Sequence, residues 1–328
     1  MKRREFLALS VATFAAFPLA TRAQQAAPGR KLGVLMPYTE NDPAAGARIA
    51  ALLSGLRAHG WIDGGNLRIE YRYAPKADAM KTGAVALVGQ SPDVLLTTTN
   101  LATIALHRET RTIPIIFVGG GDMIKEGLVS SLARPGGNVT GFTNFEPAMG
   151  GKWLQLLKEM APALRRVGFL HNPDTAANIN DMHFADAAAR PLNVDVVPLP
   201  TRNRDDIERA VREFAAASDA GIVVAPNPTT IGNHSLVVDL ANAHHLPAVY
   251  PLDFYATEGG LMSYGPDQLD MFKRGAAYVD QILKGTSAGS LPVQAPTKFE
   301  LVINQKTAKS MAIVVPSSLL ARADEVIE

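Results

Sequence analysis

The chain has 328 residues, of which 47% are hydrophobic and 19% are charged, so it can bury a large core and is not a disordered polymer. The 32 Lys and Arg residues almost balance the 31 Asp and Glu residues, which argues against a nucleic-acid-binding protein. The absence of cysteine excludes thiol nucleophiles, cysteine-ligated zinc and iron–sulfur clusters. By its length, the chain is expected to hold about two domains.

Residues 1–23 have the layout of a signal peptide. A basic start is followed by a mainly apolar stretch over 7–20 and by small residues that end at Ala23. Residues 3–7 match the R-R-x-F-L core of the twin-arginine signal, and the alternative is a general secretory signal that contains two arginines. We therefore expect export to the periplasm with removal of residues 1–23.

The first half of the mature chain alternates predicted strands and helices. Residues 32–36 predict a short strand, and Ile49, Leu52, Leu53 and Leu56 then share one face of a helix. Residues 67–73 alternate apolar and charged side chains, which predicts a half-exposed strand at a sheet edge. Residues 94–96 and 113–118 are apolar throughout, as in interior parallel strands.

The second half repeats this alternation. Strands are predicted at 166–170, 194–197, 221–225 and 248–250, and helices near 176–190, 204–217 and 231–245. Repeated βαβ units predict parallel sheets that are covered by helices on both faces.

One unit of the pattern occurs twice, about 133 residues apart. Residues 112–117 resemble 245–250, and each segment is followed by a glycine-containing loop and a second short strand at 139–142 or 261–264. An amphipathic helix then follows in each case, over 147–160 or 267–284. The alternatives are two similar lobes and simple convergence of βαβ segments.

Several motifs carry a family resemblance. They comprise residues 137–142, the helix that begins at 151–153, and the segments 165–173, 259–265 and 296–304. Together they resemble the ABC transporter substrate-binding protein family, which includes bacterial tryptophan- and tyrosine-binding receptors. The resemblance runs from about Lys31 to Glu328, and the segment 296–304 is its most specific part.

The resemblance implies a type 1 periplasmic-binding fold, an α/β architecture of two doubly wound parallel-sheet lobes joined by three crossings. It also implies an ABC permease in the inner membrane as a partner. Members often carry Asp-Pro after the fourth strand, where this chain has Gly119–Met123, so the ligand is not carried over.

The repeated unit indicates where the chain changes lobe. We expect lobe one to hold residues 30–143 and 265–294, and lobe two to hold residues 144–264 and 295–328. Hinges are then expected near Asn144, Pro266 and 292–296.

Motifs for catalysis or cofactor binding are missing from the sequence. It contains no H-E-x-x-H, no phosphate-binding loop and no G-x-S-x-G elbow. Gly119–Gly121 lacks dinucleotide spacing, and adjacent His244 and His245 point to different helix faces. We expect no enzyme activity, no cofactor and no metal.

Ligands of doubly wound sheets bind at the carboxyl ends of the strands. In lobe one these positions carry Tyr38, Thr98, Thr99 and Asp122. Thr98 and Thr99, with free N–H groups at a helix start, suit a ligand carboxylate, and the alternative is helix capping. Asp122 suits an ammonium group or caps a turn, and Tyr38 suits an apolar ligand face or core packing.

In lobe two the corresponding positions carry Asn172, Asn227, Asp253 and Tyr255. The amides of Asn172 and Asn227 suit a polar ligand or a turn. Asp253 suits an ammonium group or a turn cap, and Tyr255 suits the second half of an aromatic sandwich or core packing.

Three function classes remain open. A monomeric solute receptor that closes over a small polar or aromatic ligand and delivers it to an ABC importer fits all the features. A sensory receptor for a membrane kinase or chemoreceptor has the same sequence features, whereas an exported enzyme needs catalytic groups that are not apparent. An amino acid, another organic acid or a purine-like base would each suit a mixed polar and aromatic cleft.

Overall fold

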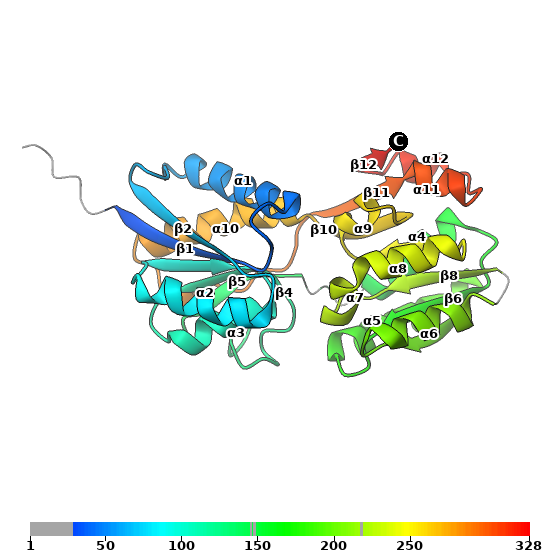
Figure 1. Ribbon diagram of the computed structural model, residues 1–328, viewed down its shortest axis with the longest axis horizontal. Coiled ribbons are helices and arrows are strands. Elements are labelled where there is room, and N and C mark those ends of the chain that lie inside the picture. The colour runs from blue at the N-terminus through cyan, green and yellow to red at the C-terminus, as the bar shows by residue number, and fades with distance from the viewer. Residues whose placement is uncertain (1–28, 145, 147–148, 217–218) are drawn as a thin grey trace, which may run out of the picture.

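The computed structural model describes residues 29–144, 146, 149–216 and 219–328. The predicted signal peptide lies outside this range. The described chain forms two lobes that lie side by side, each built around its own β-sheet (Figure 1). We call the lobe of the five-stranded sheet lobe one and the lobe of the seven-stranded sheet lobe two.

The sheet of lobe one is parallel throughout, with strand order β2-β1-β3-β4-β5. Its strands are β1 (Arg30–Met36), β2 (Leu67–Tyr73), β3 (Val94–Thr97), β4 (Ile115–Gly120) and β5 (Val139–Thr143). The strand β2 lies at the edge of the sheet and β3 is buried along its length, as their sequence patterns predict.

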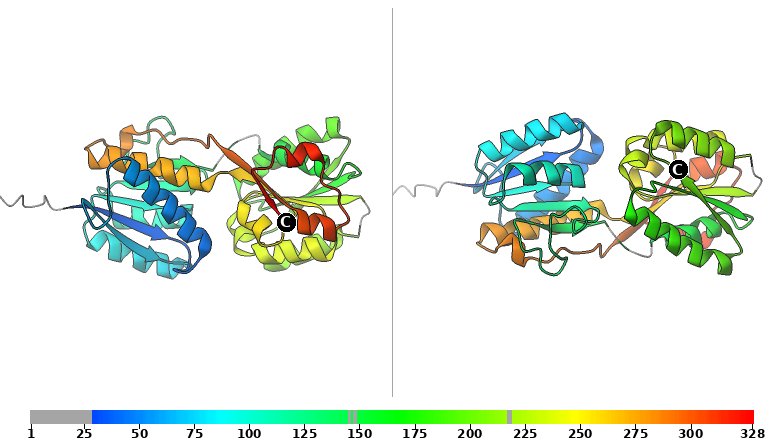
Figure 2. Two further views of the ribbon diagram at one scale, coloured as in Figure 1. Left: turned by 90° about the horizontal axis from the view of Figure 1, so that it is seen from above. Right: turned by 90° about the horizontal axis from the view of Figure 1, so that it is seen from below.

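Helices cover both faces of this sheet. One face carries α1 (Pro43–Ala58) and α10 (Gln268–Leu283), and the other carries α2 (Ala77–Gly89) and α3 (Asn100–Glu109). Although α1 and α10 are far apart in the sequence, Figure 2 shows them side by side, in blue and orange. Phe272 and Val279 of α10 share a buried cluster with Leu32 of β1.

The sheet of lobe two has the order β12-β11-β10-β9-β8-β6-β7. Its strands are β6 (Arg166–His171), β7 (Asp195–Pro200), β8 (Ala220–Val224), β9 (Ala248–Tyr250), β10 (Met262–Pro266), β11 (Phe299–Asn304) and β12 (Glu325–Ile327). All neighbours pair in parallel except β10 and β11, because the chain returns from lobe one in the opposite direction.

Two buried clusters hold lobe two together, one on each face of the sheet. The helices of this lobe are α4 (Met149–Met160), α5 (Ala176–Leu192), α6 (Arg204–Phe214), α7 (Pro228–Gly232), α8 (His234–Ala243), α9 (Asp253–Thr257), α11 (Gln305–Ser310) and α12 (Ser317–Leu320). The expected single helix over 231–245 is therefore two helices, since Asn227 starts the short α7 with a capping box and α8 begins only at His234.

The chain passes between the sheets three times: from β5 to α4, from β10 to α10, and from the short helix η1 (Ala288–Ser290) to β11. Side chains of two of these segments meet beside β4. Asn144 Nδ2 donates to the Gly119 carbonyl at 3.0 Å, and Gln268 Nε2 donates to Asn144 Oδ1 at 3.1 Å. A Cβ at Gly119, whose φ is +83°, would lie 3.0 Å from Gln268 Oε1, so glycine suits this junction. The predicted α/β fold of two doubly wound lobes with three crossings is confirmed.

Within the described ranges, no helix has both the length and the apolar character that a membrane span requires.

Candidate functional site

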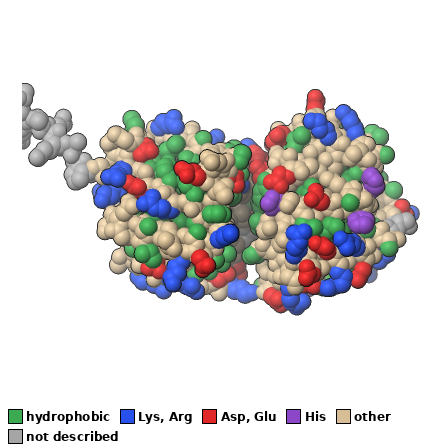
Figure 3. Space-filling model, in the orientation of Figure 1, with side chains coloured by type: hydrophobic (Ala, Val, Ile, Leu, Met, Phe, Trp, Pro, Cys, Tyr) green, Lys and Arg blue, Asp and Glu red, His purple; other side chains and the backbone are tan. Residues whose placement is uncertain are grey.

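A groove separates the two lobes on the face shown in Figure 3. In a parallel sheet the carboxyl ends of the strands share one edge, where ligands of this kind of architecture bind. The loops after β1, β3 and β9 lie at such edges and contain Tyr38, Thr98 and Asp253.

Tyr38 lies in the loop between β1 and α1 and is half-buried against the core of lobe one. The guanidinium of Arg48, on α1, lies over its ring, with Cζ 5.2 Å from the ring centroid. Burial raises the pKa of the Tyr38 hydroxyl, the Arg48 charge opposes this rise, and the carboxylates of Asp42 and Asp253 add to it.

Asp253 belongs to lobe two, so the charge that acts on the Tyr38 hydroxyl comes from the other lobe. It is the first residue of α9, and its Oδ1 is buried without a hydrogen-bond partner among the described residues. A buried carboxylate oxygen without a donor is costly for the free protein, so this atom is available to a ligand donor.

Thr98 and Thr99 follow β3 as expected, but their hydroxyl groups make different contacts. Thr99 adopts φ of 70° and caps α3, since its Oγ1 accepts from the Ala102 N–H at 3.4 Å. Thr98 is buried, with 4% of its surface exposed, and its hydroxyl has no hydrogen bond to another described residue. The capping alternative therefore accounts for Thr99, and carboxylate binding by Thr98 stays a prediction.

Asp122 follows β4 on an exposed turn. Its Oδ1 accepts from the N–H groups of Ile124 and Lys125, at 3.2 and 3.1 Å. The turn-capping alternative accounts for this residue, and we leave it out of the proposed site.

Asn172 and Asn227 are joined by the buried Asn178 of α5. Asn178 Oδ1 accepts from the Asn172 N–H at 3.0 Å and from Asn227 Nδ2 at 2.9 Å. Asn227 Oδ1 also accepts from the first turn of α7, and Asn172 Oδ1 accepts from the Asp174 N–H. These bonds stabilise the loops after β6 and β8, so a ligand contact by either amide stays a prediction.

The prediction that Tyr255 forms half of an aromatic sandwich needs correction. Its side chain is fully buried in lobe two and stacks on Tyr250, with ring centroids 4.9 Å apart. Its hydroxyl donates to the Thr230 carbonyl at 2.9 Å. Tyr255 belongs to the core, because the aromatic side chain on α9 packs against Tyr250 of β9.

A charged cluster lies at the crossings beside Asp253. Lys298 Nζ is 2.7 Å from Asp267 Oδ2 and 3.8 Å from Glu300 Oε1. Burial raises the pKa of Asp267, but the hydrogen bonds from Lys298 and the Asp270 N–H, together with the Lys298 charge, outweigh it and the pKa falls below its ordinary value. Burial and the neighbouring Asp267 raise the pKa of Glu300 to about 7, and Asp253 adds to this rise.

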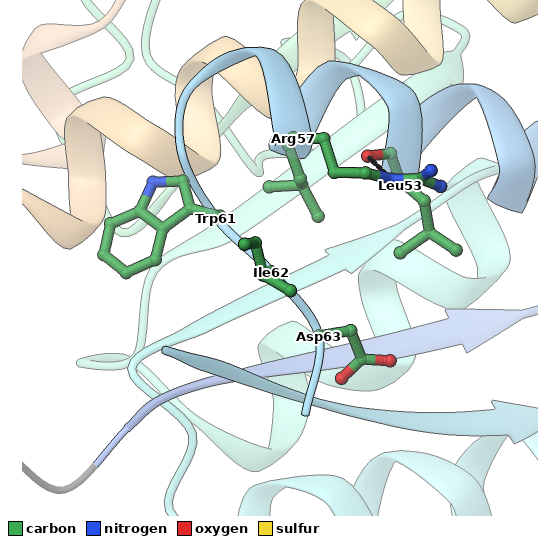
Figure 4. A pocket seen from close by; sticks show the side chains of 6 residues that line it. Leu53, Arg57, Trp61, Ile62 and Asp63 are labelled. Atoms are coloured by element: carbon green, nitrogen blue, oxygen red, sulfur yellow. Dashed lines mark hydrogen bonds between the residues drawn. The ribbon is translucent and has the colours of Figure 1, made fainter. Parts of the chain in front are cut away.

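A separate hollow of about 190 Å³ lies where α1 ends and the chain turns towards β2 (Figure 4). Two of its polar side chains already have hydrogen-bond partners in the protein. Arg57 Nε donates to the Leu53 carbonyl, and Asp63 Oδ1 accepts from the Ile69 N–H. The lining of this hollow begins at Leu53, ten residues or about 15 Å along α1 from Pro43, which follows the loop that carries Tyr38. It is not part of the candidate site.

Sequence reasoning missed Arg48. It lies on the buried face of α1, in line with Ala45 and Leu52, and only 4% of its surface is exposed. The signal was available, since Arg48 falls three residues after Ala45 and four before Leu52 on the helix.

Comparison with known proteins places the chain in a family. The sequence profile described as "ABC transporter substrate binding protein" matches residues 36–327. The tyrosine-binding protein of Clostridioides difficile (strain R20291) is 24% identical over 261 residues, which cover 79% of this chain and 74% of that protein.

Two crystal structures resemble the described chain closely. A conserved domain protein from Vibrio cholerae is 30% identical, with a TM-score of 0.77. The match covers 90% of this chain and 99% of that one. An ABC domain from Streptococcus pneumoniae in complex with L-Trp is 25% identical, with a TM-score of 0.78. The match covers 91% of this chain and 100% of that one. The two lobes form a type 1 periplasmic-binding fold, and the chain belongs to the ABC transporter substrate-binding protein family.

Proposed function

We propose that this protein is an exported receptor that binds an aromatic amino acid between its lobes and delivers it to an ABC permease of the inner membrane. It acts by binding and not by catalysis. The observation that carries the proposal is that Tyr38 and Asp253 follow parallel strands of different lobes, with a buried carboxylate oxygen of Asp253 that has no hydrogen-bond partner among the described residues.

The chemistry of these residues suits such a ligand. The Tyr38 ring offers an apolar face, and Asp253 offers an acceptor to an ammonium group. A relative in the family is described as tyrosine-binding, and a structural neighbour holds L-Trp, which supports an aromatic amino acid as the ligand class.

Closure of the lobes follows from contacts on both sides of the groove. A ligand that touches both lobes binds the closed form more tightly, and it shifts the population by that difference in affinity. We propose that lobe one comprises residues 30–143 and 267–294, and lobe two residues 144–266 and 295–328. The expected boundary at 265 moves to 267 because β10 runs to Pro266 in the sheet of lobe two. The hinges lie near Asn144, Pro266 and 292–296, where the chain passes between the sheets.

Ligand binding is expected to stabilise and compact the protein. L-tryptophan or L-tyrosine at about 100 times its dissociation constant should add about 2.7 kcal/mol to the free energy of unfolding. Small-angle scattering of the monomer should show a smaller radius of gyration with ligand than without it. D-tryptophan is the matched control, and a scattering profile unchanged by saturating ligand would contradict closure.

Export by the twin-arginine route is a separate expectation. The basic pair Arg3 and Arg4 stands before an apolar stretch, as this route requires. Replacing both arginines by lysine preserves the charge and should abolish accumulation of the mature protein in the periplasm, as measured by cell fractionation. Unchanged accumulation of this variant would exclude the route while leaving export by the general secretory pathway.

A further inference from the structure

Arg48 is buried where an arginine is rarely found without an ion-pair partner. It lies on the buried face of α1, which packs against the core of lobe one, and only 4% of its surface is exposed. Arginine side chains are almost never fully buried unless they are paired, because removing the charge from water is unfavourable.

Among the residues that the structure describes, the Arg48 guanidinium has no carboxylate partner that neutralises it. Its Nε is buried without a hydrogen-bond acceptor, and no carboxylate of the described chain lies within ion-pair distance of Arg48. Its one close polar contact within these residues is with the π face of Tyr38. The ligand-free protein therefore holds a buried positive charge that a bound anion would satisfy.

Tyr38 locates this charge relative to the groove. The phenol hydroxyl is within electrostatic reach of Arg48 on its own lobe and of Asp253 on the other. Arg48 and Asp253 thus act on one phenol with opposite charges from different lobes, and each has a buried polar atom without a hydrogen-bond partner among the described residues.

We propose that Arg48 is the residue that binds the anionic group of the ligand and thereby selects ligands that carry a carboxylate. This inference rests on the proposed function and gives Arg48 the role that the sequence suggested for Thr98 and Thr99. A ligand with a carboxylate and an ammonium group would then bridge Arg48 of lobe one and Asp253 of lobe two, and would favour closure.

The test compares three probes by isothermal titration calorimetry. L-tryptophan carries both groups, indole-3-propionate lacks the ammonium group, and tryptamine lacks the carboxylate. The wild type should bind L-tryptophan about ten- to hundredfold more tightly than tryptamine, which is the range for a charge-assisted hydrogen bond. In Arg48→Met this preference should fall to within about threefold.

Two further variants separate recognition from folding. Arg48→Lys keeps the charge and loses the planar fork, so it should retain part of the preference for the carboxylate. Arg57→Met removes an exposed arginine from the same helix, whose Nε donates to Leu53, and should leave all three affinities unchanged. If Arg48→Met does not fold, the wild-type comparison and Arg48→Lys still decide the question.

Each result bears on the inference in a defined way. Wild-type protein that binds tryptamine as tightly as L-tryptophan would overturn it, as would an Arg48→Met variant that keeps the full preference; both leave the proposed function intact. Binding of indole-3-propionate but not L-tryptophan, with loss in Arg48→Met, would support Arg48 and contradict the amino-acid ligand. Failure of the wild type to bind any of these probes or L-tyrosine would contradict both.

Discussion

Replacing Asp253 by alanine should weaken binding of the amino-acid ligand by about ten- to hundredfold, because a charge-assisted hydrogen bond contributes about 1.5–3 kcal/mol. The same change should leave the stability of the ligand-free protein unchanged or raise it. The Asp253 Oδ1 atom is buried and accepts no hydrogen bond from the described residues, so removing it relieves a desolvation penalty at that atom. Calorimetry measures the affinity, and urea denaturation without ligand measures the stability.

Asp122→Ala is the matched control for this experiment. Asp122 also follows a parallel strand, but its carboxylate is exposed and accepts from two N–H groups of its own turn. Its removal should cost about 0.5–2 kcal/mol of stability, the usual range for a lost cap, and should leave the affinity unchanged. Equal ligand affinities for wild type and Asp253→Ala would remove Asp253 from the site.

Much of the fold could be predicted because periodicity and burial agree in this chain. The alternation of charged and apolar residues over 67–73 belongs to an edge strand, and the uninterrupted apolar run at 94–96 belongs to a buried one. Hydrophobic periodicity carries no information about strand direction, however, so the antiparallel pairing of β10 with β11 could not be read from it. The start of the short helix α7 depends on the capping box at Asn227, a signal that acts over only a few residues.

The candidate site was less predictable, because a polar residue at a strand end has the same local sequence whether it binds a ligand or stabilises its own loop. Asn227 is committed to Asn178, 49 residues away in the chain, whereas Asp253 has no such partner for its Oδ1. Only the packing of distant segments separates these two cases. Arg48 shows the converse, since its charge lies on a helix face that periodicity assigns to the core.

Asp181 is another buried carboxylate of lobe two. It lies on α5, where 5% of its surface is exposed, and its backbone carbonyl packs against Gly150 of α4 so closely that a Cβ there would lie 1.8 Å from the oxygen. Burial raises the pKa of the Asp181 carboxyl from 3.8 to about 7. Its negative form is therefore unfavourable in the folded protein.

Asp181→Asn should stabilise the protein at high pH and have little effect at low pH. Below about pH 4 the carboxyl is protonated in the folded and unfolded states alike, and between pH 4 and 7 only the unfolded state loses the proton. The wild type therefore loses stability relative to the variant as the pH rises, and the difference levels off above pH 7. At about 1.4 kcal/mol per pH unit, this difference approaches 4 kcal/mol at pH 8.

Urea denaturation of both proteins at pH 4, 6 and 8 measures this difference in stability. The control is Asp186→Asn, an exposed position on the same helix, which should show no such trend. A stability difference between wild type and Asp181→Asn that is the same at all three pH values would show that the pKa of Asp181 is the same in the folded and unfolded protein, and that its burial is compensated within the fold.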